Sequence, residues 1–200
     1  MTLARAIAAG DATATLKMLT AQPELARASF ATGATRQDPT THFLDEIGQY
    51  IYAGDTALHV AAGACATTIV RKLIANGAEI GERNRRGAEP LHLASMGMPG
   101  GRHWNPRAQA ATIACLIDAG ADPNAVDNSG VAPLHRAVRT RCAAAVEALL
   151  TGGADAKLKN KSGSTPMMLA KMNTGRGGSG SIEARAQQQE IVRLLRNYKA

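Results

Sequence analysis

Aromatic side chains are scarce in this sequence of 200 residues: two phenylalanines, three tyrosines and one tryptophan make up 3% of a chain that is 45% hydrophobic. A core with so few large rings must be filled by alanine, leucine, isoleucine, valine and methionine, which suit helices that approach one another closely. The composition therefore favours an all-helical fold of thin layers. The length fits a single domain or a short repeat array.

Long apolar runs and paired cysteines are missing as well. No run of about 18 apolar residues occurs, so we expect no membrane-spanning helix. The N-terminal segment lacks the basic cluster and sustained apolar stretch of a signal peptide. Cys65, Cys115 and Cys142 are widely spaced and form no CxxC motif, which argues against a disulfide framework or a zinc site. We therefore expect a cytoplasmic protein that binds neither membrane nor metal.

The net charge of +7 is unevenly distributed. Residues 131–200 contain twelve lysines and arginines but only four acidic residues, whereas the rest of the chain is nearly balanced. Acidic protein surfaces would be attracted to this region. Nucleic acid is the alternative partner, but it is disfavoured, because Tyr198 is the only ring in the region on which a base could stack.

Four similar segments recur along the chain and carry the main signal. GDTALHVAA, GAEPLHLAS, GVAPLHRAV and GSTPMMLAK begin at Gly54, Gly87, Gly130 and Gly163, which are 33, 43 and 33 residues apart. Each is followed by a second apolar half: VRKLIANGAEI, IACLIDAGADP, VEALLTGGADA and IVRLLRNYKA. The second and fourth units have ten and twelve extra residues between their halves. A fixed period of this length predicts a repeat array.

The residues at the ends of each half predict helices. Thr165 can cap a helix whose first residue is Pro166, where the missing N–H costs nothing. The second halves end at Gly77, Gly120 and Gly153. Helices commonly end with a residue in the left-handed conformation, which glycine adopts most easily. Each unit is therefore predicted to be a pair of helices followed by a turn.

These segments resemble the ankyrin repeat, whose pattern is G-x-TPLH-x-A-A, a second helix, then GAD and a turn. The resemblance implies an all-α solenoid of about five helix-pair repeats with hairpin-like β-turn fingers. It divides a single domain into residues 1–28 (N-terminal capping repeat), 29–53 (a long inserted loop), 54–86, 87–129 and 130–162 (repeats), and 163–200 (C-terminal capping repeat). Within the inserted loop we predict a short helix at 42–47 and an extended stretch at 49–53.

One histidine per repeat, at positions 59, 92 and 135, suggests a metal site. Zinc holds imidazole nitrogens at about 2.0–2.1 Å, whereas stacked helices lie about 8–10 Å apart, so these side chains cannot converge on one ion. The resemblance implies instead that they form hydrogen bonds between adjacent repeats. Glu89 and Ala132 replace the family's threonine, so the threonine–histidine bond cannot form there in the same way.

No other pattern predicts catalysis. Gly175, Gly177 and Gly180 match G-x-G-x-x-G but follow a predicted helix, so a flexible linker is favoured over a dinucleotide site. An anion held by Arg176 and Arg185 at the next helix N-terminus is a weaker alternative. There is no GxSxG motif and no facing pair of carboxylates. We predict no catalytic residue, no cofactor and no metal.

The resemblance implies a concave surface lined by fingers and first helices, and hence a protein-interaction module. Trp104, in the insertion at 98–107, is either a partner contact or a lid packed on its own repeat with Pro99 and Pro106. We expect an acidic partner; self-association and anion or nucleic-acid binding through the C-terminal third stay open. The candidate contact residues are Arg83, Arg85, Arg86, Met96, Trp104, Asp127, Asn128, Arg139, Lys159 and Lys161.

Overall fold

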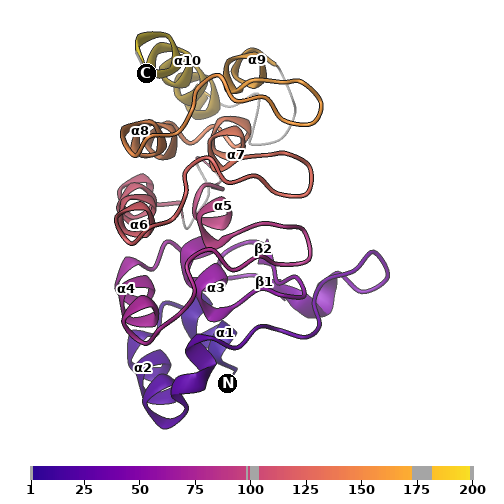
Figure 1. The fold of residues 1–200 in the computed structure, drawn as a ribbon, viewed down its shortest axis with the longest axis vertical. Coiled ribbons are helices and arrows are strands. Elements are labelled where there is room, and N and C mark those ends of the chain that lie inside the picture. Colours follow the sequence, from indigo (N-terminus) through magenta and orange to yellow (C-terminus); the bar gives the residue numbers. More distant parts are fainter. Residues whose placement is uncertain (1, 98, 100–103, 173–181, 199–200) are drawn as a thin grey trace.

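Two layers of stacked helices make up the molecule (Figure 1). The computed structural model describes residues 2–97, 99, 104–172 and 182–198. The inner layer consists of α1 (Leu3–Ala8), α3 (Ala57–Gly63), α5 (Pro90–Ala94), α7 (Pro133–Arg139) and α9 (Pro166–Lys171). The outer layer consists of α2 (Ala12–Ala21), α4 (Thr67–Ala75), α6 (Pro106–Asp118), α8 (Ala143–Thr151) and α10 (Ile182–Asn197). Each helix packs on the next member of its own layer, as the predicted all-α repeat solenoid requires.

The helix ends follow the chemistry expected from the sequence. Thr165 Oγ1 accepts a hydrogen bond from the backbone N–H of Met168, and Pro166 is the first residue of α9. Gly77, Gly120 and Gly153 have positive φ angles of 82°, 106° and 92° just after the second helices. A side chain is strained in this region of φ, so glycine ends these helices at little cost.

Leucine and alanine fill the space between repeats. Leu58, Leu91 and Leu134 occupy equivalent places in successive inner helices and are almost fully buried. Each buried leucine contributes about 2 kcal/mol by removing apolar surface from water. Because alanine follows one turn later, neighbouring helices approach closely without large rings. No helix in the described ranges is both long enough and apolar enough to cross a membrane.

Three turns, which we call the fingers (residues 82–87, 125–130 and 158–163), project from the inner layer. In each finger a side-chain oxygen of Asn84, Asp127 or Asn160 accepts hydrogen bonds from the backbone N–H groups two and four residues later, which fixes the turn. Backbone bonds also join each finger to the next, Asn128 N–Arg86 O (3.0 Å) and Lys161 N–Ser129 O (3.3 Å). The first finger is joined in the same way to the segment before α3, by Arg85 N–Ala53 O (2.8 Å).

We expect Asn84→Ala to lower the free energy of unfolding by about 2–3 kcal/mol. Asn84 is buried, and besides fixing its finger it donates a 2.7 Å hydrogen bond to the buried carboxylate of Asp55. Urea unfolding measures the loss. Asn160→Ala is the matched control, since Asn160 makes the same turn bonds without a buried acid as partner. Equal losses in the two variants would show that the bond to Asp55 contributes nothing.

Residues 29–53, which we call the insertion, contain a small hairpin and the 3₁₀ turn η2 (Thr40–His42). Another 3₁₀ turn, η1 (Pro23–Ala26), precedes the insertion in the chain. Strand β1 (Phe43–Leu44) pairs antiparallel with β2 (Gln49–Tyr50). The predicted helix at 42–47 is therefore wrong. The rings of Phe43 and Tyr50 pack 4.7 Å apart across the strands, and Gly48 has φ 62°, so the chain reverses where a helix would continue. The extended stretch predicted at 49–53 is found in part, as β2.

Hydrogen bonds fix the insertion to the inner layer and, through Arg85 N and Ala53 O, to the first finger. Phe30 pairs with the backbone of Asp55 (2.7 Å), and Ala34 N donates to Ile51 O (2.8 Å). The Gln49 side chain donates to the carbonyl of Gly63 at the end of α3 (3.3 Å). The hairpin therefore lies beside the inner helices and the fingers, on the side where the concave surface is expected (Figure 1).

Candidate functional site

A groove of about 320 Å³ lies between the insertion, the first two fingers, α5 and α7. Its wall on one side is the β2 segment, and its floor comes from the ends of the two inner helices. The lining residues are Gly48, Gln49, Tyr50, Tyr52, Asn84, Arg86, Ala88, Leu93, Met96, Asp127, Ser129, Val131, Arg136, Arg139 and Thr140. We call this cavity the groove.

A second cavity of about 550 Å³, the side hollow, shares Tyr50, Tyr52 and Arg86 with the groove. It is more open and is bordered mainly by the insertion. Its other lining residues are Ala34, Thr35, Arg36, Pro39 and Arg85. Together the two cavities are lined by five arginines and a single carboxylate, that of Asp127. Such a surface attracts negative charge.

The Tyr52 ring joins the insertion to the first finger. The guanidinium of Arg86 lies 4.9 Å from the ring centroid and donates to the phenol oxygen at 2.9 Å. Arg85 lies 5.5 Å from the same centroid and donates to the carbonyl of Ala34. Each cation over the ring is stabilised by about 0.5–1 kcal/mol where it is exposed. These contacts hold two positive charges at the edge of the groove.

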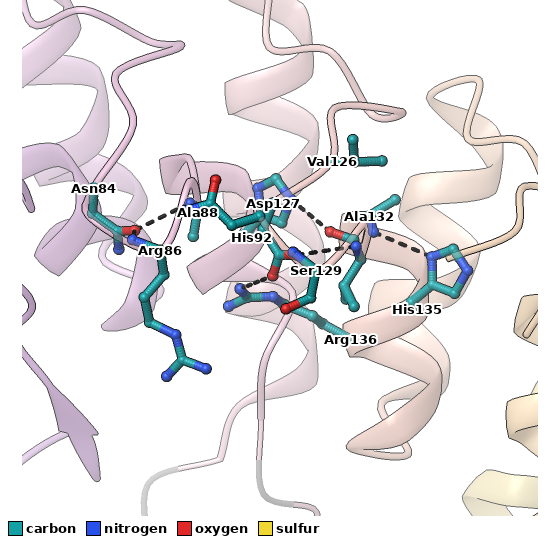
Figure 2. A network of polar contacts seen from close by, with 12 residues as sticks. Asn84, Arg86, Ala88, His92, Val126, Asp127, Ser129, Ala132, His135 and Arg136 are labelled. Carbon is teal, nitrogen blue, oxygen red and sulfur yellow. Dashed lines mark hydrogen bonds and ion pairs between the residues drawn. The ribbon is translucent and has the colours of Figure 1, made fainter. Parts of the chain in front are cut away.

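Asp127 and Arg136 form a 2.8 Å ion pair at the groove wall (Figure 2). Burial raises the pKa of Asp127, but hydrogen bonds from Arg136 and from the backbone of Val131 and Ser129 outweigh it and lower the pKa. Burial lowers the pKa of Arg136, and the positive charges of Arg86 and Arg139 lower it further. The attraction of Asp127 raises the pKa but does not cancel this lowering. Arg86 and Arg139 therefore each lie close enough to Arg136 to repel it.

The three repeat histidines are structural, as the resemblance implied. In each ring Nδ1 accepts the backbone N–H at the start of its own helix, at 3.1 Å for His59, 3.1 Å for His92 and 3.2 Å for His135. Only the first repeat adds a threonine hydroxyl, that of Thr56 at 3.0 Å. The Nε2 atoms bond to backbone carbonyls of the following repeat, those of Ala88 (3.0 Å), Val131 (3.1 Å) and Ser164 (3.2 Å).

A neutral ring makes both of these bonds when its proton is on Nε2. Burial lowers the pKa of all three histidines, and for His92 to about 4, where the charge of Arg136 adds to burial. Each histidine therefore links two repeats in its neutral form. Among the described residues there is no group of three His, Cys, Asp or Glu side chains that could hold a metal ion.

The structure places the predicted contact residues in three groups. Arg86, Met96, Asp127 and Arg139 line the groove, and Arg85 lines the side hollow. Arg83, Asn128 and Lys161 use their side chains to bond a neighbouring finger, through the carbonyls of Val126, Arg85 and Asn128 respectively. Lys159 is exposed and borders neither cavity.

Trp104 lies away from both cavities. Its indole N–H is 3.4 Å from Gln109 Oε1, and the Gln109 amide in turn donates to the carbonyls of Ala94 and Met96, both at 3.0 Å. The half-buried ring thus packs on its own repeat, and its N–H also lies near the thiol of Cys142 in the following repeat. Contact with a partner stays a prediction for this residue.

Sequence reasoning missed the contribution of the insertion. Tyr50 and Tyr52 line both cavities, and Arg136 carries the ion pair. A signal was available, because four of the six aromatic residues of the chain lie in the insertion: Phe30, Phe43, Tyr50 and Tyr52. Rings concentrated in an inserted loop are typical of a contact surface.

The thiols of Cys65 and Cys142 do not resemble nucleophiles. Burial raises the pKa of Cys65 to about 12 and also raises the pKa of Cys142, so the reactive thiolate is disfavoured. The glycine-rich segment with Arg176 lies outside the described residues, and anion or nucleic-acid binding by the C-terminal third stays a prediction.

Comparison with known proteins agrees with this geometry. A model of a single ankyrin repeat matches residues 53–85, and a model of ankyrin repeats in many copies matches residues 116–170. The mouse (Mus musculus) protein "Ankyrin repeat and SOCS box protein 16" is 36% identical over 112 residues, which is 56% of this chain and 24% of that protein. "E3 ubiquitin-protein ligase KEG" of Arabidopsis thaliana is 38% identical over 98 residues, 46% of this chain and 5% of that protein.

The matched region is thus a small part of both relatives. The remainder of each relative has no counterpart in its alignment with this chain. Ankyrin repeats generally serve as protein–protein interaction modules and are generally non-catalytic. The stacked helix pairs, the fingers and the inter-repeat histidines fit those matches, and the predicted resemblance is confirmed. The chain belongs to the ankyrin-repeat family.

Proposed function

We propose that this protein binds a partner protein through its concave face, without catalysing a reaction, and that the surface it contacts is acidic. The observation that carries the proposal is the positive charge of the two cavities, which are lined by five arginines and one carboxylate. Solvated arginines on a convex helix would be unremarkable, but a concave surface focuses their field on whatever enters. The three free cysteines fit a reducing compartment, so the proposal places this binding in the cytoplasm.

The fingers make the face suited to binding. Backbone and side-chain bonds join each finger to the next, so the surface is largely formed before a partner arrives. A preformed surface loses less entropy on association than a mobile one. Ion pairs at its edge would mainly speed the encounter with the partner, and salt would weaken that effect.

Photo-crosslinking in the native cell tests the proposal. A photoreactive amino acid at Ser129, an exposed position on the groove, should crosslink a partner, whereas the same group at exposed Arg71 on the outer helix α4 should not. Arg139→Glu should then reduce the yield from Ser129 about tenfold, because one favourable charge becomes repulsive. Products from Arg71 alone would refute binding by the concave face. A product with twice the mass of the chain would identify self-association instead.

A further inference from the structure

The groove differs from a plain ankyrin concave face because the insertion forms one of its walls. Tyr50 and Tyr52 belong to the insertion, whereas Arg86 lies on the first finger and Arg139 ends α7. Residues about ninety positions apart in the chain therefore border one cavity. A partner segment in the groove would touch the insertion and the repeats at once.

The charge of the groove is only partly neutralised. Arg136 is paired with Asp127, but the Arg86 guanidinium bonds only to the neutral phenol of Tyr52. Within the described part of the chain, the exposed Arg139 side chain makes no hydrogen bond or ion pair. Two positive charges thus face the cavity without an acidic partner. One carboxylate could bond to both, and such charge-assisted bonds are stronger than neutral ones.

Apolar groups lie beside these charges. Leu93, Met96 and Val131 line the same cavity, and Tyr50 leaves 40% of its surface exposed. A simple anion such as phosphate would leave this apolar surface in water. A side chain or pair of side chains with apolar and acidic parts would cover both.

The wall formed by the insertion is held firmly. A Cβ atom at Gly33 would collide with the backbone of Tyr52 and Ala53, so the beginning and the end of the insertion pass in close contact there. Gln49 bonds the hairpin to the end of α3, and Arg86 bonds Tyr52. The cavity therefore exists before a ligand enters, which favours recognition of one defined segment.

We propose that the groove is a receptor for a short extended segment of the partner in which acidic and apolar side chains alternate, the carboxylate bonding Arg86 and Arg139 and the apolar side chain packing on Met96 and Tyr50. Neighbouring side chains of an extended segment point to opposite sides. An acidic side chain can therefore meet one part of the groove lining while the apolar side chain beside it meets another. This inference rests on the proposed function and adds the chemistry of the bound segment and the role of the insertion in selecting it.

Fluorescence anisotropy with a labelled octapeptide of alternating glutamate and leucine tests the inference. We expect a dissociation constant between about 10 µM and 1 mM, since a single short segment buries little surface. Arg139→Gln and Tyr50→Ala should each weaken binding about tenfold, because they remove the carboxylate partner and the exposed ring. Arg71→Gln, which removes a charge from the outer layer, should leave binding unchanged.

Three further probes separate charge, apolar contact and polymer type. An octapeptide of alternating glutamate and serine should bind about tenfold more weakly, and one of alternating lysine and leucine should not bind. A labelled single-stranded oligonucleotide should bind more weakly than the glutamate–serine octapeptide. Tight oligonucleotide binding that depends on Arg139 would overturn the inference in favour of a general anion site.

The inference can fail while the proposed function stands. No binding of the glutamate–leucine peptide at about 1 mM, or binding that is indifferent to Arg139→Gln and Tyr50→Ala, would overturn it. If crosslinks from Ser129 persist in that case, the concave face binds a partner of other chemistry. If no crosslink forms from Ser129 either, both the inference and the proposed function fail.

Discussion

Acidification from pH 7 to pH 4 should lower the free energy of unfolding by about 3 kcal/mol through His92 alone. Burial, with the charge of Arg136, lowers the pKa of this ring from 6.5 to about 4. The unfolded chain takes up the proton as the pH falls through about 6.5, whereas the folded chain does so only near 4. The contribution is therefore complete above pH 6.5 and is lost as the pH falls towards 4.

Urea unfolding of the protein and of His92→Gln at several pH values isolates this effect. The difference between the two unfolding free energies should shrink by about 3 kcal/mol from pH 7 to pH 4. The comparison with His92→Gln is needed because other groups also make stability depend on pH. Burial raises the pKa of Asp55 and of Glu89, so these two groups stabilise the fold as the pH falls, in the opposite direction to His92. A difference that stays constant with pH would mean that His92 is not held neutral by the fold.

Asp127→Ala should cost about 3–4 kcal/mol of stability, because it leaves the largely buried Arg136 without its counter-charge. It also removes the acceptor for the N–H groups of Ser129 and Val131 in the second finger. Asp127→Asn should cost about half as much, since its amide oxygen can still accept those bonds. Chemical unfolding followed through Trp104 fluorescence measures both losses.

A second change separates the ion pair from the turn. In the Asp127→Asn background, Arg136→Met should recover much of the lost stability, because an apolar chain of similar length replaces an unpaired charge. Asp127→Asn should also bind the glutamate–leucine peptide a few-fold more tightly, since one positive charge of the groove is no longer neutralised. Unchanged stability in Asp127→Asn would show that the pair with Arg136 is not what holds this finger.

The repeats could be predicted because their signals are local and recur. Gly77, Gly120 and Gly153 end helices through their own backbone freedom, and Thr165 caps α9 within three residues of itself. The spacing of stacked helices excluded one zinc ion shared by the three histidines, and the resemblance to the ankyrin repeat implied their hydrogen bonds between repeats. Each of these arguments needs only a few neighbouring residues and one packing distance.

The insertion could not be predicted in the same way. The spacing of its apolar residues fits a helix at 42–47, but Phe43 meets Tyr50 across a hairpin, and tertiary contact decides between the two. The pairing of Arg86 with Tyr52 likewise joins positions 34 residues apart. Long-range contacts of this kind depend on where the whole insertion lies, and no short pattern in the sequence specifies that.

The sequence by itself determined that helix pairs stack in register, because each pair carries its own caps and its own apolar side, and three successive pairs carry a histidine link. Only the tertiary structure decided where the two cavities lie and which charges line them. In the folded chain the insertion packs beside the fingers, Asp127 pairs with Arg136, and Arg86 and Arg139 line a cavity. The physical reason is range: backbone propensity and capping act within a few residues, whereas the charge of a groove is a sum over side chains that only folding brings together.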